Sequence, residues 1–443
     1  MSEISQNSKQ INYTVTQQYA FSKYLAGENI FITGPGGSGK SAMIREIMKD
    51  ATNRNINYQI CALTGCAAIL LNCGAKTIHS WGGIGLGNGL NSEIAHNVYT
   101  NKSKRKKWKN ISLLIIDEVS MMSEKLIELL DMIAKKCRHN SKPFGNIQVI
   151  FSGDFYQLAP VGNRNDIKTT NFCFESPTFS EMFPKENCIQ FKNIFRQTDP
   201  IYSKILNQIR VGRITKNSIK LLEIHAKRKY VSRNGIKPTI LFPLKKSVRQ
   251  INNQSMSELK TPIVSFNLII NICSESSTEE NARQIGYLKN NVNCEQILKL
   301  RVGAQVMCIV NLMSKKNSED KQICNGSQGI ITSFNEDGFP VVKFLDGFSQ
   351  VITPYEWKSE SNPDISICQI PLILAWAITI HKSQGASISL AEVDVGSDIF
   401  ACGQTYVALS RVTHLDGLFL MHFNYKKIKV SKKVKAFYKQ LLS

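Results

Sequence analysis

The chain has 443 residues, with 55 Lys or Arg against 34 Asp or Glu, so its net charge is +21. A charge this large exceeds what solubility requires and favours a polyanionic partner, with nucleic acid the leading candidate. The apolar fraction of 42% can build full cores, and the 12 cysteines contain no Cys-x-x-Cys pair, which favours reduced thiols over disulfides or a zinc site. We expect an intracellular protein without membrane contact, because neither a signal-peptide pattern nor a bilayer-length apolar stretch is found. The sequence does not choose among nucleus, mitochondrion and viral replication site.

A glycine-rich segment is the clearest functional signal. It matches G-x4-G-K-[ST] and lies between the apolar run Ile30–Thr33 and a helical pattern containing Met43 and Ile47. In this context backbone N–H groups surround a polyphosphate, the lysine reaches the β- and γ-phosphates, and the hydroxyl is a ligand for Mg²⁺. The segment therefore predicts binding and hydrolysis of a nucleoside triphosphate with Mg²⁺ by Gly34, Pro35, Gly36, Gly37, Ser38, Gly39, Lys40 and Ser41.

Apolar runs alternate with helical patterns through the N-terminal half, which predicts a mainly parallel sheet with its ligand at the carboxyl ends of the strands. One run ends in Asp117 and Glu118. There the first carboxylate would hold Mg²⁺ and the second would orient or deprotonate the attacking water. After the next run comes Gln157, an amide that can sense the γ-phosphate. The expected strands are 30–33, 58–63, 111–116, 147–151 and 188–191.

Residues 142–161 strongly resemble the signature stretch of the PIF-type (petite integration frequency) DNA helicases of superfamily 1B, which are related to the RecD-like enzymes. The sequence departs from the family pattern at Asn146, where glycine is usual, at Ser152 for cysteine, and at Ala159 for proline. These departures concern loop geometry and leave the phosphate chemistry intact. The resemblance extends in family order through residues 64–68, 77–85, 195–197, 206–210, 302–307, 325–329, 374–385 and 406–412.

The resemblance implies an α/β fold with two RecA-like P-loop domains, parallel sheets and ATP in the cleft between them. A small arm is expected in the first domain, and an inserted SH3-like β-barrel domain in the second. Within the insertion, the Ser/Glu-rich stretch Ser274–Asn281 is typical of a flexible connection. The expected ranges are 1–184 for the first domain with its arm at about 78–109, 185–254 and 370–443 for the second, and 255–369 for the insertion.

Residues from both domains are implied at the ATP site. Arg196 and Arg411 look like arginines donated by the second domain, and guanidinium groups suit the spread charge of the transition state. Gln17 matches the adenine-reading glutamine of the family, because an amide offers one donor and one acceptor to the adenine edge. Its neighbour Gln18 is an alternative one residue away.

Two groups of residues are predicted to contact nucleic acid. By resemblance, the surface loops that grip a single strand carry Thr64, Thr77, His79, Trp81, His381 and Ser383. The basic run around Trp108 follows the His79 motif, where the family carries its arm at the duplex junction, so we expect DNA contact from Lys104, Lys106 and Lys107. A second lysine-rich run, 426–439, has an amphipathic pattern, and we interpret its lysines as the solvated face of a final helix.

The sequence thus predicts an ATP- and Mg²⁺-dependent DNA helicase that translocates on single-stranded DNA and unwinds duplexes in replication, repair or recombination. The resemblance alone implies 5′-to-3′ polarity. Expected partners are single-stranded DNA and duplex junctions, with RNA–DNA hybrids and G-quadruplex DNA as further partners to consider, and a monomer is expected in solution. Two alternatives stay open: an RNA-directed or dual helicase, since these motifs do not reveal 2′-hydroxyl discrimination, and an ATP-gated nucleic-acid clamp that does not unwind.

Overall fold

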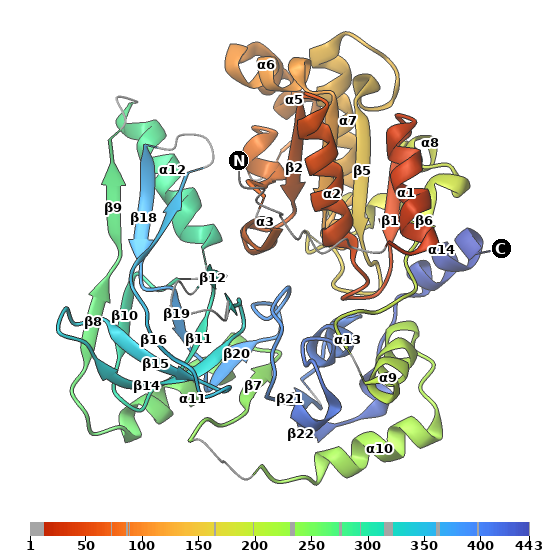
Figure 1. Ribbon diagram of the computed structural model, residues 1–443. Coiled ribbons are helices and arrows are strands. Elements are labelled where there is room, and N and C mark those ends of the chain that lie inside the picture. The colour runs from red at the N-terminus through yellow and green to blue at the C-terminus, as the bar shows by residue number, and fades with distance from the viewer. Residues whose placement is uncertain are drawn as a thin grey trace, which may run out of the picture.

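The computed structural model describes residues 13–71, 73–85, 87, 89–163, 165–197, 199–230, 235–273, 277–292, 294–313, 322–359, 364–396 and 398–442. Two parallel sheets and an antiparallel insertion make up these residues (Figure 1). No helix in the described ranges is both long and apolar enough to cross a membrane.

The first sheet has the strand order β3-β2-β4-β5-β1-β6 and, in the described residues, all of its strands pair in parallel. Its strands β1 and β4 are buried along their whole length, as expected for a sheet covered by helices on both faces. All five predicted strands lie in it, so the predicted parallel sheet is confirmed. The strands are β1 (Ile30–Thr33), β2 (Tyr58–Ala62), β3 (Lys76–Thr77), β4 (Leu113–Asp117), β5 (Gln148–Gly153) and β6 (Cys188–Gln190).

Helices connect and cover this sheet. The longest is α7 (Glu124–Arg138), which begins at an N-cap where Ser123 Oγ accepts a hydrogen bond from Leu126 N. Its buried Asp131 accepts a hydrogen bond of 2.7 Å from Phe144 N and fixes the next turn. Asn146 lies in that turn at a φ of 63°, a conformation that asparagine tolerates better than most residues, so it can replace the usual glycine. The other helices are α1 (Val15–Leu25), α2 (Lys40–Asn53), α3 (Gly65–Leu71), α4 (Ile78–Trp81), α5 (Asn91–Thr100), α6 (Lys102–Asn110) and α8 (Pro177–Met182).

The predicted arm consists of α5 and α6, at the top of the first domain in Figure 1. Its basic run is helical and is anchored by Trp108, which is fully buried and donates from Nε1 to Gly82 O at 3.1 Å. The Trp81 and Trp108 rings pack with their centroids 4.6 Å apart. Lys104 Nζ donates to Gly83 O at 2.9 Å, so this lysine ties the helix to the preceding turn.

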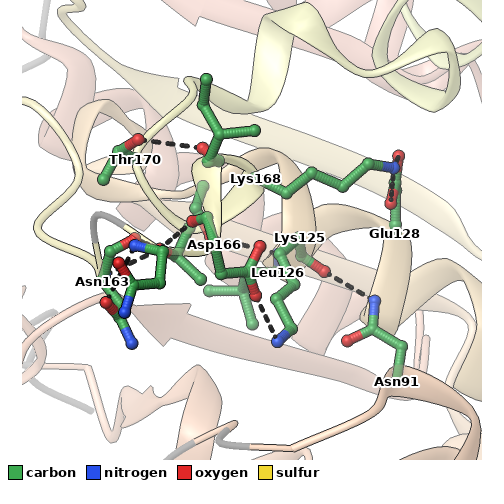
Figure 2. Close-up of polar contacts among 12 residues, drawn as sticks. Asn91, Lys125, Leu126, Glu128, Asn163, Asp166, Lys168 and Thr170 are labelled. Atoms are coloured by element: carbon green, nitrogen blue, oxygen red, sulfur yellow. Dashed lines mark hydrogen bonds and ion pairs between the residues drawn. The ribbon is translucent and has the colours of Figure 1, made fainter.

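The segment that follows the Gln157 loop is held against α7 (Figure 2). Lys125 Nζ lies 2.8 Å from Asp166 Oδ2, and Lys168 Nζ lies 2.8 Å from Glu128 Oε2. Asn91 Nδ2 of α5 donates to Lys125 O, which links the arm to the same helix. These contacts hold residues 166–168 and the start of α5 against the body of the first domain.

The second parallel sheet has the order β20-β7-β21-β22 within the described residues. It provides the second of the two predicted parallel-sheet domains. Its strands are β7 (Thr239–Phe242), β20 (Ala377–Thr379), β21 (Ala391–Val395) and β22 (Leu418–Phe423), and its helices are α9 (Pro200–Val211), α10 (Lys216–Ala226), α11 (Lys245–Glu258) and α13 (Gln404–Leu409).

The insertion contains an antiparallel sheet in the order β16-β15-β14-β11-β19. The apolar patterns around residues 304–310, 329–334 and 341–344 predict three short strands, and all three lie in this sheet. Its likeness to an SH3 barrel stays a prediction. The stretch expected to be a flexible connection is in part helical, because α12 begins at Thr278; residues 274–276 lie outside the described residues. The elements are β8 (Val264–Asn267), β9 (Ile269–Ile272), α12 (Thr278–Asn291), β10 (Ile297–Leu300), β11 (Gln305–Cys308), β12 (Leu312–Met313), β13 (Gln322–Ile323), β14 (Gln328–Phe334), β15 (Pro340–Phe344), β16 (Ser349–Val351), β17 (Tyr355–Lys358), β18 (Ile365–Gln369) and β19 (Leu372–Leu374).

Three expected domain boundaries and the assignment of the last helix differ from the packing. Strand β6 pairs with β1, so the first sheet continues to Gln190 rather than ending at 184. Helix α11 continues through residue 254, and β19 pairs with β11 of the insertion, so the chain rejoins the second sheet at β20. The final helix α14 (Lys432–Leu442) packs into the core of the first domain through Val434 and Tyr438, although the second domain was expected to include it.

Trp108→Ala should lower the free energy of unfolding of the first domain by about 3–5 kcal/mol, the usual cost of truncating a buried tryptophan. Urea denaturation followed by circular dichroism measures the change. Lys109→Ala, the adjacent exposed position, is the control and should stay within about 0.5 kcal/mol of the parent. An unchanged midpoint for Trp108→Ala would contradict the anchoring of the arm.

Candidate nucleotide and nucleic-acid site

The phosphate-binding loop connects β1 to α2, and its glycines are required by space as well as by conformation. Gly37 and Gly39 have φ values of 79° and 88°. A Cβ atom at Gly37 would lie 2.3 Å from Arg196 Cβ, and one at Gly39 would lie 2.6 Å from Gln17 Nε2. Larger residues would therefore strain the backbone and collide with two residues predicted to act at this site.

Lys40 is the first residue of α2, and its Nζ donates to Gly34 O at 2.8 Å and to Pro35 O at 3.0 Å. The ammonium group thus lies over the loop at the carboxyl end of β1. Burial lowers its pKa, while the nearby carboxylates of Asp154, Glu118 and Asp117 act in the opposite direction.

The geometry distinguishes the two adjacent glutamines. Gln17 is buried, and its Oε1 accepts a hydrogen bond of 2.9 Å from Thr14 N in a capping box at the start of α1. This interaction leaves Nε2 beside Gly39. Gln18 instead donates to Tyr13 O in an exposed contact. Gln17 is therefore the residue positioned at the nucleotide loop.

Phe195 was given no role in the sequence-based predictions, yet it lies at the same place. Its ring comes within 3.5 Å of the Cβ position of Gly39, and its backbone N–H donates to Gly37 O at 2.8 Å. The side chain is 56% exposed, so it presents a free apolar face beside Gln17. The aromatic start of the Phe195-Arg196-Gln197 motif was the sequence signal that could have identified it.

The acid pair follows β4 as predicted. Asp117 ends the strand, and Glu118 has a φ of 57°, a left-handed conformation that is costly for this side chain. Burial raises the pKa of both carboxyls, repulsion from Asp117 adds to the effect on Glu118, and Lys40 opposes it. Ser41 and Asp117 offer hydroxyl and carboxylate oxygens, the donor type that Mg²⁺ requires, so the residues present fit this ion.

The two predicted arginines meet at the phosphate loop. From the Cβ position of Gly36, Arg411 Nη2 is 3.5 Å away and Arg196 Nη1 is 3.7 Å away. Arg411 is held by hydrogen bonds from Nε to Val407 O at 3.0 Å and from Nη2 to Ser410 Oγ at 2.9 Å. Burial and the proximity of Arg196 lower the pKa of Arg411 to about 10, while Glu118 acts in the opposite direction. The guanidinium group of Arg411 is therefore held in a fixed position from which it can bind an anion at the phosphate loop.

Contacts within the second domain and between the two domains support this arrangement. Tyr406 of α13 accepts a hydrogen bond of 3.0 Å from Gly36 N at its hydroxyl oxygen. Gln197 donates from Nε2 to Ser410 O at 3.2 Å, which links the segments that carry the two arginines. Gln157 is buried in the first domain, and Gly403 approaches it so closely that an added Cβ would lie 2.3 Å from Gln157 O. No role had been predicted for Tyr406 or Gly403.

The residues predicted to grip DNA fall into two classes. His381, Lys106 and Lys107 are exposed. The His381 ring lies 6.4 Å from that of Phe400, an exposed aromatic residue that no motif had indicated. Thr64 and His79 are partly exposed, and Thr64 Oγ1 accepts a hydrogen bond from Ala67 N at the start of α3.

The other predicted contacts are buried. Trp81 packs against Trp108 in the base of the arm, so it has no ring face free to stack on a base. Thr77 caps α4 by accepting from Ser80 N, and Ser383 donates from Oγ to Ile380 O at 2.8 Å. The prediction of direct DNA contact by these three side chains is corrected, because their interactions hold the loops rather than face solvent.

Two parallel-sheet domains together form one site. They contribute to it a phosphate loop, an acid pair, a glutamine and two arginines, and these features define a RecA-like P-loop nucleoside triphosphatase with an inserted β domain. The chain belongs to the PIF1-like helicase family. The model of that family matches residues 3–220, and the model of the DNA helicase Pif1 2B domain matches residues 287–334.

Relatives agree with this assignment along the chain. The ATP-dependent DNA helicase PIF1 of Xenopus laevis is 33% identical over 98% of this chain, and the match spans 65% of that protein. The crystal structure of Pif1 helicase from Candida albicans is 34% identical, with a TM-score of 0.76, and covers 98% of this chain and 100% of that chain. Pif1 helicase from Bacteroides in complex with ADP-AlF3 and ssDNA is 29% identical, with a TM-score of 0.65, and covers 97% of both chains. The chain spans less than two thirds of the length of the curated Xenopus relative.

Glu118→Gln should raise the melting temperature measured without nucleotide, and the gain over the parent should grow with pH. Because the pKa of Glu118 is raised, the folded chain keeps a proton that the unfolded chain has already lost. Stability of the parent therefore falls as pH rises from the ordinary carboxyl value through the raised one. Differential scanning fluorimetry across that window measures the effect. Glu93→Gln, at an exposed position on α5, is the control, and an equal pH dependence in both variants would contradict the burial argument.

Proposed function

We propose that this protein is an ATP- and Mg²⁺-dependent DNA helicase that translocates on single-stranded DNA and unwinds duplexes. One observation carries the proposal: Arg411, Arg196 and the Tyr406 hydroxyl of the second domain all lie within 3.8 Å of the Cβ position of Gly36 in the first. A site assembled from two bodies is complete only when they close, so each hydrolysis cycle would open and close the cleft. This motion is what a translocating motor requires.

The chemistry divides among the residues as follows. The loop amides and Lys40 bind the phosphates, and the two arginines stabilise the charge that develops on the transferred phosphoryl group. Glu118 orients the attacking water and accepts its proton, an assignment that its raised pKa supports because a carboxylate of higher pKa is a stronger base. Mg²⁺ held through Ser41 and Asp117 would neutralise charge on the β- and γ-oxygens. Gln157 reports the state of the γ-phosphate to Gly403 and the second domain.

DNA is the proposed polyanion. The family membership supports it, as does the single-stranded DNA in the complex of the Bacteroides relative. The net charge of +21 supplies the long-range attraction. We further propose 5′-to-3′ movement, duplex junctions as the site of action and a role in replication, repair or recombination. An intracellular location and a monomeric state stay predictions of the sequence.

Strand displacement tests the proposed activity directly. Duplexes with a 5′ or a 3′ single-stranded tail, each made in DNA and in RNA, are offered with ATP and Mg²⁺. We expect displacement of the 5′-tailed DNA only, and none with Lys40→Ala, which loses the phosphate-reaching charge. Displacement from a 3′ tail would reverse the polarity, and equal activity on RNA would indicate a dual helicase. ATP-dependent binding with no displacement would make the protein a clamp.

The arm provides a separate prediction. Lys106→Gln combined with Lys107→Gln should reduce the slope of log affinity for single-stranded DNA against log salt by about 1.4, at about 0.7 for each phosphate contact. Unwinding should fall, while ATP hydrolysis at saturating DNA should persist. Lys104 is left unchanged because it bonds to Gly83 O.

The matched control for the arm is Lys216→Gln with Lys220→Gln, two exposed lysines on α10 of the second domain. Both pairs remove the same charge, so a general loss of attraction would affect them equally. An unchanged salt slope in the arm variant would show that its lysines are merely solvated.

A further inference from the structure

The C-terminal helix α14 is not an appendage of the second domain, from whose last strand the chain arrives. It lies against the first domain (Figure 1), and its Val434 and Tyr438 belong to that domain's core. The Phe437 ring stacks on Phe174 with centroids 4.4 Å apart. Lys433 pairs with Glu175 on the helix's outer side. The amphipathic pattern of the tail therefore has a specific partner surface.

The hydroxyl of Tyr438 joins the ends of two strands that carry the nucleotide site. It is buried, lies 2.6 Å from Thr33 Oγ1, and accepts a hydrogen bond of 3.2 Å from Phe155 N. Thr33 ends β1 immediately before the phosphate loop, and Phe155 lies two residues before Gln157. One side chain thus sets the spacing between the loop and the γ-phosphate glutamine.

Arg210 brings the second domain into the same cluster. From α9 its Nε and Nη2 each donate to Asp154 at 2.8 Å, and the side chains are 5% and 0% exposed. The guanidinium lies 4.6 Å from the Tyr156 ring centroid and 5.6 Å from that of Tyr438, and these two rings stack 4.7 Å apart. A buried ion pair is costly unless its geometry is this complete, so the arrangement resists small displacements.

The cluster is connected to the arginines of the second domain. On the same helix as Arg210, Tyr202 donates from its hydroxyl to Leu409 O at 2.6 Å, two residues before Arg411. A continuous path of buried contacts therefore leads from Thr33, beside the phosphate loop, through Tyr438 and Arg210 to the segment that holds Arg411.

We propose that Tyr438 is a positioning residue for ATP hydrolysis. With Asp154 and Arg210 it forms a latch that, when the two domains are closed, fixes the phosphate loop and Gln157 of the first domain relative to Arg411 of the second. This inference rests on the proposed function. According to this proposal, the lysine-rich C-terminal segment helps to position the two domains for ATP hydrolysis, a role that its composition does not indicate.

Tyr438→Phe is the main test, because it removes the hydroxyl and keeps the ring stack. At saturating single-stranded DNA, kcat should fall about tenfold with KM for ATP changed less than about twofold, the pattern of an interaction that acts on the transition state. Thr33→Val removes one of the two contacts of this hydroxyl, so kcat should fall in the same direction. The double variant should lose little more than Tyr438→Phe alone, since Tyr438→Phe already removes the shared contact. Tyr425→Phe, at an exposed tyrosine of the same segment, is the matched control and should match the parent.

Phe437→Leu separates positioning from stability, because it weakens the docking of α14 and leaves the hydroxyl in place. We expect a lower melting temperature with a kcat near that of the parent. If Tyr438→Phe also lowers only the melting temperature, the hydroxyl is merely structural and the proposal is overturned. If the losses of kcat in Tyr438→Phe and Thr33→Val add up in the double variant, the two side chains do not act through one contact, which would also overturn the proposal. If the parent hydrolyses ATP and Tyr438→Phe leaves kcat unchanged, this inference alone is overturned. A parent that hydrolyses no ATP removes the proposed function and this inference together.

Discussion

The arrangement of the two domains depends on one electrostatic constraint: cationic side chains must surround the concentrated negative charge of a polyphosphate in a space that excludes water. Arg411 of the second domain is buried and Lys40 at the phosphate loop is partly buried, and this burial lowers the pKa of each. Cations kept apart from solvent interact strongly with an anion, but they repel one another when no anion lies between them. Because Lys40 and Arg411 lie on two separate domains, these two charges converge only when the domains close, whereas Arg196 and Arg411 lie on the same domain and repel each other there.

The same constraint explains why the end of β4, which carries the acid pair, is unfavourable for the stability of the fold. Burial raises the pKa of both Asp117 and Glu118, repulsion from Asp117 raises that of Glu118 further, and Glu118 also has a left-handed backbone conformation. Neither feature helps the chain to fold, and both suit a base beside bound phosphate. The surrounding sheet compensates: β1 and β4 are buried along their whole length, so their hydrogen bonds and apolar packing hold the unfavourable strand ends in position.

Much of this fold could be predicted because the deciding information is local. Runs of β-branched and aliphatic residues end where the strands end, and the glycines and lysine of the phosphate loop occur at fixed spacing. The choice between Gln17 and Gln18 could not be made this way, since it depends on a capping box that only the folded helix end forms. Trp81 was misread for a related reason: an aromatic residue in a DNA-binding motif has the same sequence signature whether it faces a base or, as here, packs on Trp108.

The two lysine-rich segments extend this lesson. Helices α6 and α14 each carry lysines on one side and bury aromatic residues on the other, Trp108 in the first and Tyr438 in the second. An amphipathic pattern predicts that a face is buried but does not say against what, because the partner surface is assembled from distant parts of the chain. In α6 the partner is the turn that precedes the arm, so the lysines project from the first domain's edge. In α14 the partner surface is formed by the strand ends beside the phosphate loop. The lysine-rich tail, which the sequence suggests is only a charged surface, therefore contacts both the first domain and Arg210 of the second through Tyr438.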